Sequence, residues 1–131
     1  MKRTMSIVVI TFFILLIWGA IRDSKKVKLY SGLNVDSITY VGIHTPFAGF
    51  GTDDKNEILE ITQDLKELTF YKDSNLMPAN NTPDAWIVLE GKNDVIIDRV
   101  VVYGNFATHS KDENKYEFDY SNLDKLCEKY K

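Results

Sequence analysis

An uninterrupted apolar run near the start of the chain is its strongest pattern. Within residues 5–21 only Ser6, Thr11 and Gly19 interrupt the large hydrophobic side chains, and no charged residue occurs. These 17 residues are close to the shortest stretch that crosses the ~30 Å hydrocarbon core of a bilayer. Because the run has no polar face, it is not typical of a helix in a soluble core. We therefore expect residues 5–21 to contact membrane lipid.

The same run could belong to a membrane anchor or to a cleaved signal peptide. Signal cleavage requires small residues at the first and third positions before the cut. A cut after Ala20 places the large Trp18 at the third position, and a cut after Gly19 places Ile17 there. We expect residues 1–24 to form a membrane anchor or signal segment that is not cleaved. Secretion after cleavage is the alternative.

Charges on the two sides of the run bear on its orientation. Two basic residues precede it and four follow it closely: Lys2 and Arg3, then Arg22, Lys25, Lys26 and Lys28. Counted alone, these would place the rest of the chain in the cytoplasm. However, moving the charged N-terminal tail outward costs about 2.3 kcal/mol per charge per 100 mV, whereas long domains translocate largely regardless of charge. We expect a single-pass protein of the cell membrane with its domain outside the cytoplasm.

After the run, the periodicity changes to that of a folded domain. Residues 25–36 are polar and basic and predict a linker, and residues 37–131 predict the domain. Alternation over 37–44 predicts a strand. Apolar residues three and four apart predict a helix from about Asp54 to Leu68, with Asp54 and Glu57 at capping-box spacing.

Further elements follow in the second half of the chain. The pattern predicts a short strand over 69–72, a loop over 73–84, two hairpins (86–90 with 95–103, and 106–110 with 116–119) and a final helix capped by Ser121 and Asp124. Both faces of 95–103 are apolar, which predicts a central strand. The elements together predict an α+β fold, with a mainly antiparallel sheet of about five strands and two packed helices after the hydrophobic helix.

Composition and charge limit the classes of function. Of the 16 basic and 19 acidic residues, 13 and 18 lie in residues 25–131, which gives this part a net charge of −5. Such an acidic domain is a poor candidate for nucleic-acid binding. One cysteine excludes an internal disulfide, a zinc-finger framework and a CxxC redox pair. We expect no cofactor and no metal.

Few residues suggest chemistry. His44, Asp53, Asp54 and His109 could act as acid–base groups of a small hydrolase-like enzyme if they meet in one pocket. The two histidines are 65 residues apart, so their spacing does not suggest a metal site. Gly49 and Gly51 precede a helix start, but the acidic pair would repel a phosphate there. We therefore predict no catalytic residues and treat the enzyme as the alternative.

Exposed apolar residues suggest binding instead. Leu76 and Met77 lie in a polar loop, and Trp86 opens the strand that follows. Our leading interpretation is a membrane-tethered, non-catalytic domain that binds a protein or another envelope component, with these three residues as the candidate contact. A further alternative is an inhibitor or accessory subunit that docks through a sheet edge.

The layout also suggests a resemblance. The chain has 13 lysines and three arginines, a short anchor, a helix with Glu-Ile-Leu-Glu-Ile and a hairpin with Trp-Ile-Val-Leu-Glu. In this layout it resembles small membrane-anchored or exported proteins of unknown function from Gram-positive bacteria. The resemblance covers residues 1–131, implies a bacterial envelope setting, and implies no activity.

Overall fold

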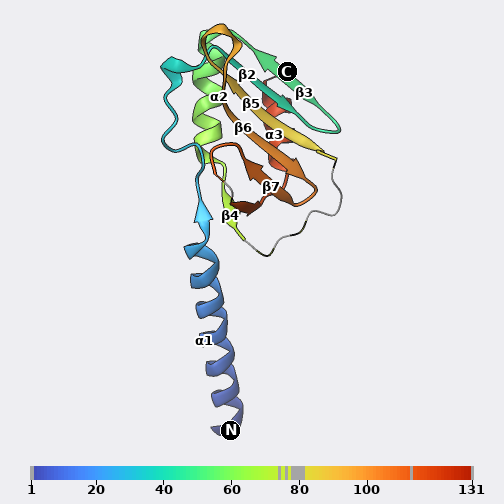
Figure 1. Ribbon diagram of the computed structural model, residues 1–131. Helices are drawn as coiled ribbons and strands as arrows, with labels where there is room; N and C mark the ends of the chain where they lie inside the picture. The colour runs from blue at the N-terminus through green and yellow to red at the C-terminus, as the bar shows by residue number, and fades with distance from the viewer. Residues whose placement is uncertain (1, 74, 76, 78–81, 113, 131) are drawn as a thin grey trace.

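The computed structural model describes residues 2–73, 75, 77, 82–112 and 114–130. The helices are α1 (Lys2–Ser24), α2 (Lys55–Glu67) and α3 (Ser121–Lys129), with short 3₁₀ turns η1 (Val35–Ser37) and η2 (Lys92–Asp94). The strands are β1 (Lys26–Val27), β2 (Tyr40–His44), β3 (Gly49–Thr52), β4 (Phe70–Lys72), β5 (Ala85–Glu90), β6 (Ile96–Tyr103), β7 (Phe106–His109) and β8 (Lys115–Glu117). Figure 1 shows α1 extending away from a body that contains all the other elements.

The strands form one antiparallel sheet in the order β1-β4-β8-β7-β6-β5-β2-β3. The predicted α+β class, the antiparallel pairing and the long apolar helix are confirmed. The prediction of about five strands is wrong, because the described residues form eight. The additional strands include β1 and β3, which are short and lie in stretches for which the pattern predicted no strand. Strand β6 is central, as its two apolar faces predicted.

The segment 25–36 belongs to the folded body instead of forming the linker that we expected. Its strand β1 pairs with β4. Tyr30 is only 1% exposed and packs edge-on against Phe70 at a ring distance of 6.5 Å. The sequence of this segment does not reveal its role, because Ser31 and Gly32 interrupt its apolar residues and no single period continues through it.

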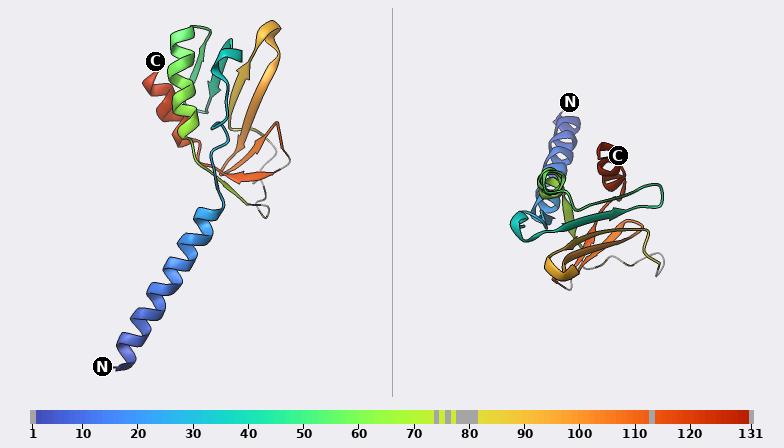
Figure 2. Two further views of the ribbon diagram at one scale, coloured as in Figure 1. Left: turned by 90° about the vertical axis from the view of Figure 1, so that its left-hand side faces the viewer. Right: turned by 90° about the horizontal axis from the view of Figure 1, so that it is seen from above.

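Helices α2 and α3 cover one face of the sheet, which we call the inner face (Figure 2). The buried residues of the helices are Ile58, Ile61, Thr62, Leu65, Leu123 and Cys127. They pack over alternate strand residues, including Val41, Ile43, Ile87, Leu89, Val100 and Val102. This alternation is that of a sheet with one covered face.

Local hydrogen bonds explain where the two helices begin. Asp54 caps α2, because its carboxylate accepts from the backbone N–H groups of Asn56 and Glu57, as the sequence predicted. The predicted cap of α3 is wrong. Its first N–H, that of Ser121, is bound by Asp119, and Asp124 instead accepts the hydroxyl of the buried Thr45 in the β2–β3 turn.

The helix α1 stands apart from this core. Its segment Thr4–Ser24 is long and apolar enough to cross a membrane, and none of it is buried in the protein. Length and composition of this kind are shared by membrane anchors and signal sequences. Its C-terminal end contacts the domain: the guanidinium of Arg22 lies 4.4 Å from the Tyr71 ring centre and 3.7 Å from a carboxylate oxygen of Glu117.

We predict opposite effects for two substitutions of Tyr30. Its buried hydroxyl has no hydrogen-bond partner among the described residues, so Tyr30→Phe should raise the free energy of unfolding by about 1 kcal/mol. Tyr30→Ala should lower it by about 3–5 kcal/mol, since a buried ring is lost. Urea denaturation of the full chain in detergent measures both. Equal stability of all three proteins would show that segment 25–36 is not part of the core.

Candidate functional site

The face of the sheet opposite α2 and α3, which we call the outer face, carries the most accessible aromatic surface of the body. Tyr40, His44 and Trp86 point to this side from β2 and β5, because they alternate with the buried residues of the same strands. Tyr40 and Trp86 are each 36% exposed, and Phe47 at the β2–β3 turn is 78% exposed. In the part of the chain that the structure describes, no helix lies over this face of the sheet (Figure 2).

Trp86 lies at the centre of this surface. It pairs with His44 across the β2–β5 ladder, and the two rings stack with centroids 4.0 Å apart and planes 15° from parallel. Trp86 and Val88 line two open hollows, of about 380 and 250 Å³. The first also contains Tyr40 and His44, and the second contains Val101 and Arg99. Accessible aromatic side chains beside a few polar groups are common in binding surfaces.

Glycines in the β2–β3 hairpin allow Tyr40 to lie across the strands. A Cβ atom at Gly51 would collide with the Tyr40 hydroxyl, and one at Gly42 would be 3.0 Å from its ring. Gly42 and Gly51 are directly opposite each other in the ladder. The hairpin backbone therefore forms the floor on which this aromatic ring rests.

The edges of the sheet are relevant to the alternative that the protein is an inhibitor or accessory subunit that docks through a sheet edge. One edge is β3, with four residues, and the other is β1, with two. Short edge strands are a common protection against pairing with another chain. The edges thus offer less surface for a partner than the outer face does.

A buried polar cluster lies on the inner face, away from this surface. Asp98 and His109 are 2% and 8% exposed. Nε2 of His109 lies 2.8 and 2.9 Å from the two carboxylate oxygens of Asp98, and its Nδ1 lies 3.3 Å from Asp112. The ammonium of Lys111 is 3.4 Å from Asp98. Buried polar groups that satisfy one another in this way hold neighbouring strands together.

Asp112 connects this cluster to the rest of the β7–β8 hairpin. Its carboxylate accepts from the hydroxyl of Tyr116 at 2.8 Å and from the backbone N–H of Asn114 at 2.9 Å. Burial acts to raise the pKa of Asp112, but these bonds and His109 outweigh it, so that the pKa lies below its ordinary value. Burial and the bonded carboxylate raise the pKa of Tyr116.

The structure does not bring the predicted acid–base residues together. From β2 across β5 and β6 to β7, His44 pairs with Trp86, Trp86 pairs with Val101, and Val101 pairs with Thr108. His44 is thus three strands from His109, or about 14 Å at the usual strand spacing. The two side chains also point to opposite faces, because His109 follows Thr108 in the strand.

The acidic pair is separate from both histidines. His44 pairs with Gly49 at one end of the β2–β3 hairpin, whereas Asp53 and Asp54 follow Thr52 at the other end, about 10 Å further along. Asp54 is occupied as the cap of α2. Among the residues that the structure describes, no group of three His, Cys, Asp or Glu side chains is placed to hold a metal ion.

The predicted contact residues have different outcomes. Trp86 lies on the outer face, partly exposed, as a contact residue must be. Met77 is 79% exposed. Leu76 lies outside the described residues. Sequence reasoning did not identify Tyr40, Val88 and Val101 as neighbours of Trp86, because their proximity depends on the strand order.

Comparisons with known proteins do not identify a family. No protein-family model, curated protein or solved structure matches the chain.

We predict that the polar cluster of Asp98, His109 and Asp112 causes the free energy of unfolding to fall at low pH. A carboxyl group with a lowered pKa in the folded state contributes stability that is complete above its unfolded pKa and is lost as the pH falls through the folded pKa. For Asp112 this loss begins near its ordinary pKa of 3.8 and continues below it.

Asp112→Asn should lower the free energy of unfolding by about 1–2 kcal/mol at pH 7 and flatten its decline below pH 4. Urea denaturation between pH 7 and 2.5 measures this. Glu128→Gln, which changes an exposed carboxylate of α3, is the control and should leave the pH profile unchanged. An unaltered profile for Asp112→Asn would contradict the prediction.

Proposed function

We propose that this protein is a membrane-tethered, non-catalytic binding domain that recognises a protein or another envelope component through its outer face. The observation that carries the proposal is the accessible surface around Trp86, which lies between two hollows on a face that no helix covers. Large aromatic side chains at the centre of an open surface commonly provide most of the binding energy of an interface.

The ionisable groups of this surface support binding more than catalysis. His44 and Glu90 line the same hollow. Glu90 pairs with Tyr40, four residues along β2 from His44, which corresponds to about 13 Å. A general base and a general acid that serve one reacting group must both reach it within hydrogen-bond distance. This separation is too large for the two to share one small substrate.

Helix α1 is the basis for the proposed attachment to a membrane. Hydrophobic side chains surround this helix, and Ile7, Phe13 and Trp18 are all more than half exposed. Leaving so much apolar surface in water is unfavourable by about 25 cal/mol per Å², and a bilayer removes this cost. We place the domain outside the cytoplasm and regard a secreted form, produced by cleavage after the apolar run, as the alternative.

Membrane extraction tests the tether. The full chain should remain in the membrane pellet after washing with alkaline carbonate, whereas Leu15→Lys combined with Phe12→Lys should release much of it, since two lysines at mid-span cost about 5–7 kcal/mol. Digestion of intact cells by an added protease tests the orientation. A domain that stays protected until the cells are opened would place it in the cytoplasm, and a shortened chain in the medium would indicate secretion.

Site-specific crosslinking tests the binding surface. A photoreactive residue at Tyr40 should form adducts in the native membrane, whereas the same residue at Leu59, on the exposed side of α2, should not. Trp86→Ala should weaken partner capture through Tyr40 by about thirtyfold, as expected for a central contact residue. Trp86→Phe should have a smaller effect. Similar adducts from both positions would argue against the outer face as the binding surface.

A further inference from the structure

The junction between α1 and the domain has no spacer. Helix α1 ends at Ser24 and β1 begins at Lys26. The carbonyl of Lys25 already accepts a hydrogen bond of 2.9 Å from the backbone N–H of Lys72, in β4. With Arg22 lying against Tyr71 and Glu117, the last turn of the helix and the first residues of the sheet form one continuous unit.

This geometry determines how close the domain comes to a bilayer. The 21 residues of Thr4–Ser24 span about 31 Å as a helix, which matches the ~30 Å hydrocarbon core. The end of α1 would then lie at the level of the lipid headgroups. The residues that line a hollow of about 170 Å³ beside it include Trp18, Arg22, Lys25, Lys72, Asp73 and Glu117. Strands β4 and β8 would therefore touch the headgroup layer.

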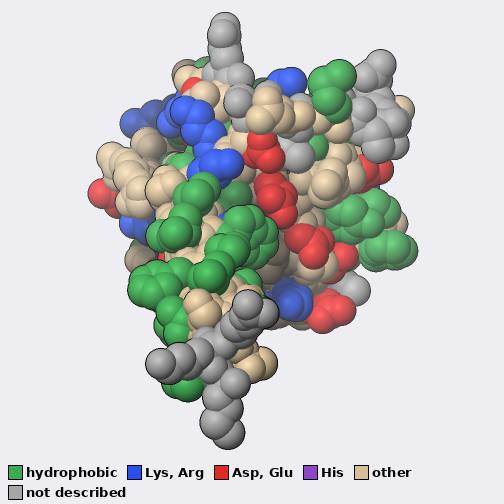
Figure 3. Space-filling view, turned by 90° about the horizontal axis from the view of Figure 1, so that it is seen from below, with side chains coloured by type: hydrophobic (Ala, Val, Ile, Leu, Met, Phe, Trp, Pro, Cys, Tyr) green, Lys and Arg blue, Asp and Glu red, His purple; other side chains and the backbone are tan. Residues whose placement is uncertain are grey.

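This end of an acidic domain carries a small excess of positive charge. Seen from the anchor end, Lys and Arg side chains gather on one side of the base of α1 (Figure 3). Those of Arg22 and Lys28 are paired with Glu117 and Glu67. The ammonium groups of Lys25, Lys26 and Lys72 make no ion pair with any residue that the structure describes. Two nearby carboxylates, of Asp23 and Asp73, reduce this positive charge without cancelling it.

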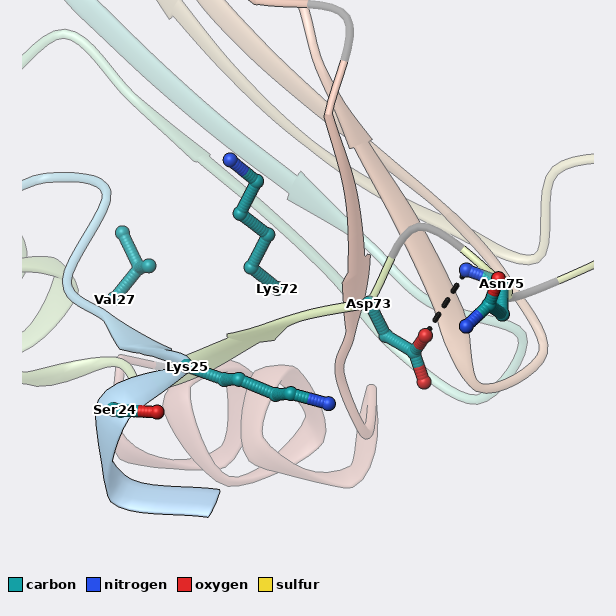
Figure 4. Close-up of a pocket in the computed structure, with 6 residues that line it drawn as sticks. All are labelled: Ser24, Lys25, Val27, Lys72, Asp73 and Asn75. Atoms are coloured by element: carbon teal, nitrogen blue, oxygen red, sulfur yellow. Dashed lines mark hydrogen bonds between the residues drawn. The ribbon is translucent and has the colours of Figure 1, made fainter. Parts of the chain in front are cut away.

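A second hollow, of about 280 Å³, shows how these groups are presented. Ser24, Lys25, Val27, Lys72, Asp73 and Asn75 line it (Figure 4). Lys25 and Lys72 extend in different directions, and the carboxylate of Asp73 accepts from the backbone N–H of Asn75 at 3.0 Å. The two ammonium groups do not converge on one point. They are suited to several phosphates spread over a surface, rather than to one enclosed anion.

We propose that the end of the domain formed by Lys25, Lys26 and Lys72 binds the headgroups of anionic phospholipids in the bilayer that holds α1. This inference rests on the proposed membrane tether and adds a lipid preference to it. Each lysine close to an anionic membrane surface raises the affinity for that surface about fivefold. Because Asp23 and Asp73 offset two of the three charges, the net effect corresponds to about one lysine, which is sufficient to enrich anionic lipid around the protein.

Fluorescence quenching in lipid nanodiscs tests this proposal with the full chain. A fluorophore is attached at Asn75→Cys; the native Cys127 is fully buried and should not react. The nanodiscs contain a small fraction of lipid with a quencher on its headgroup, either an anionic or a zwitterionic lipid. We expect the anionic quencher lipid to be at least about fivefold more effective. A fluorophore at Lys92→Cys, in the β5–β6 turn far from α1 (Figure 1), should be quenched little by either.

Charge reversal provides the matched comparison. Lys25→Glu with Lys72→Glu should abolish the preference for anionic lipid, and 0.5 M salt should weaken it. Lys92→Glu with Lys125→Glu makes the same change of net charge elsewhere on the domain and should preserve it. Equal quenching by the two lipids, or a preference that survives the first pair of substitutions, would overturn the inference. If the chain fails to enter nanodiscs at all, the membrane tether itself is wrong.

Discussion

The one-sided packing of α2 and α3 on the sheet is the constraint on which the rest of the structure depends. Ile61, Leu65, Leu123 and Cys127 are fully buried against one face of the strands. The other face therefore has to be compatible with water or with a partner. Because side chains alternate along each strand, burying Val41 and Ile43 on the inner face necessarily places Tyr40 and His44 on the outer one.

The elements with strong periodicity could be predicted from the sequence, and so could the short strands β4 and β8, whereas β1 and β3 could not. Both faces of residues 95–103 are apolar, which identified the central strand β6, and the spacing of Ile58, Ile61 and Leu65 identified α2. Strand β1 is a single lysine–valine pair among further lysines, and β3 contains two glycines, so neither has the alternating apolar side chains that indicate a strand. Their pairing depends on partners far along the chain, as Tyr30 depends on Phe70.

The candidate site shows the same division. Trp86 could be identified as a possible contact residue because of its size, but its neighbours depend on the order β6-β5-β2, which brings Val101 and Tyr40 to either side of it. His109 could be identified as a candidate by its chemistry, whereas its partner Asp98 could not, because it lies in another strand. The cross-strand pair of Val100 with His109 puts that carboxylate on the same face as the imidazole.

The fold separates the surfaces that the two proposals use. The end of the sheet formed by β1, β4 and β8 adjoins α1, whereas β2, β3, β5 and β6 carry the outer face further along the sheet order. Contact of the first group with lipid headgroups would restrict rotation of the domain about its tether. It would thereby present Trp86 in a restricted range of directions relative to the membrane. Since ordering a binding surface in advance reduces the entropy lost on association, the lipid contact and the partner contact would then favour each other.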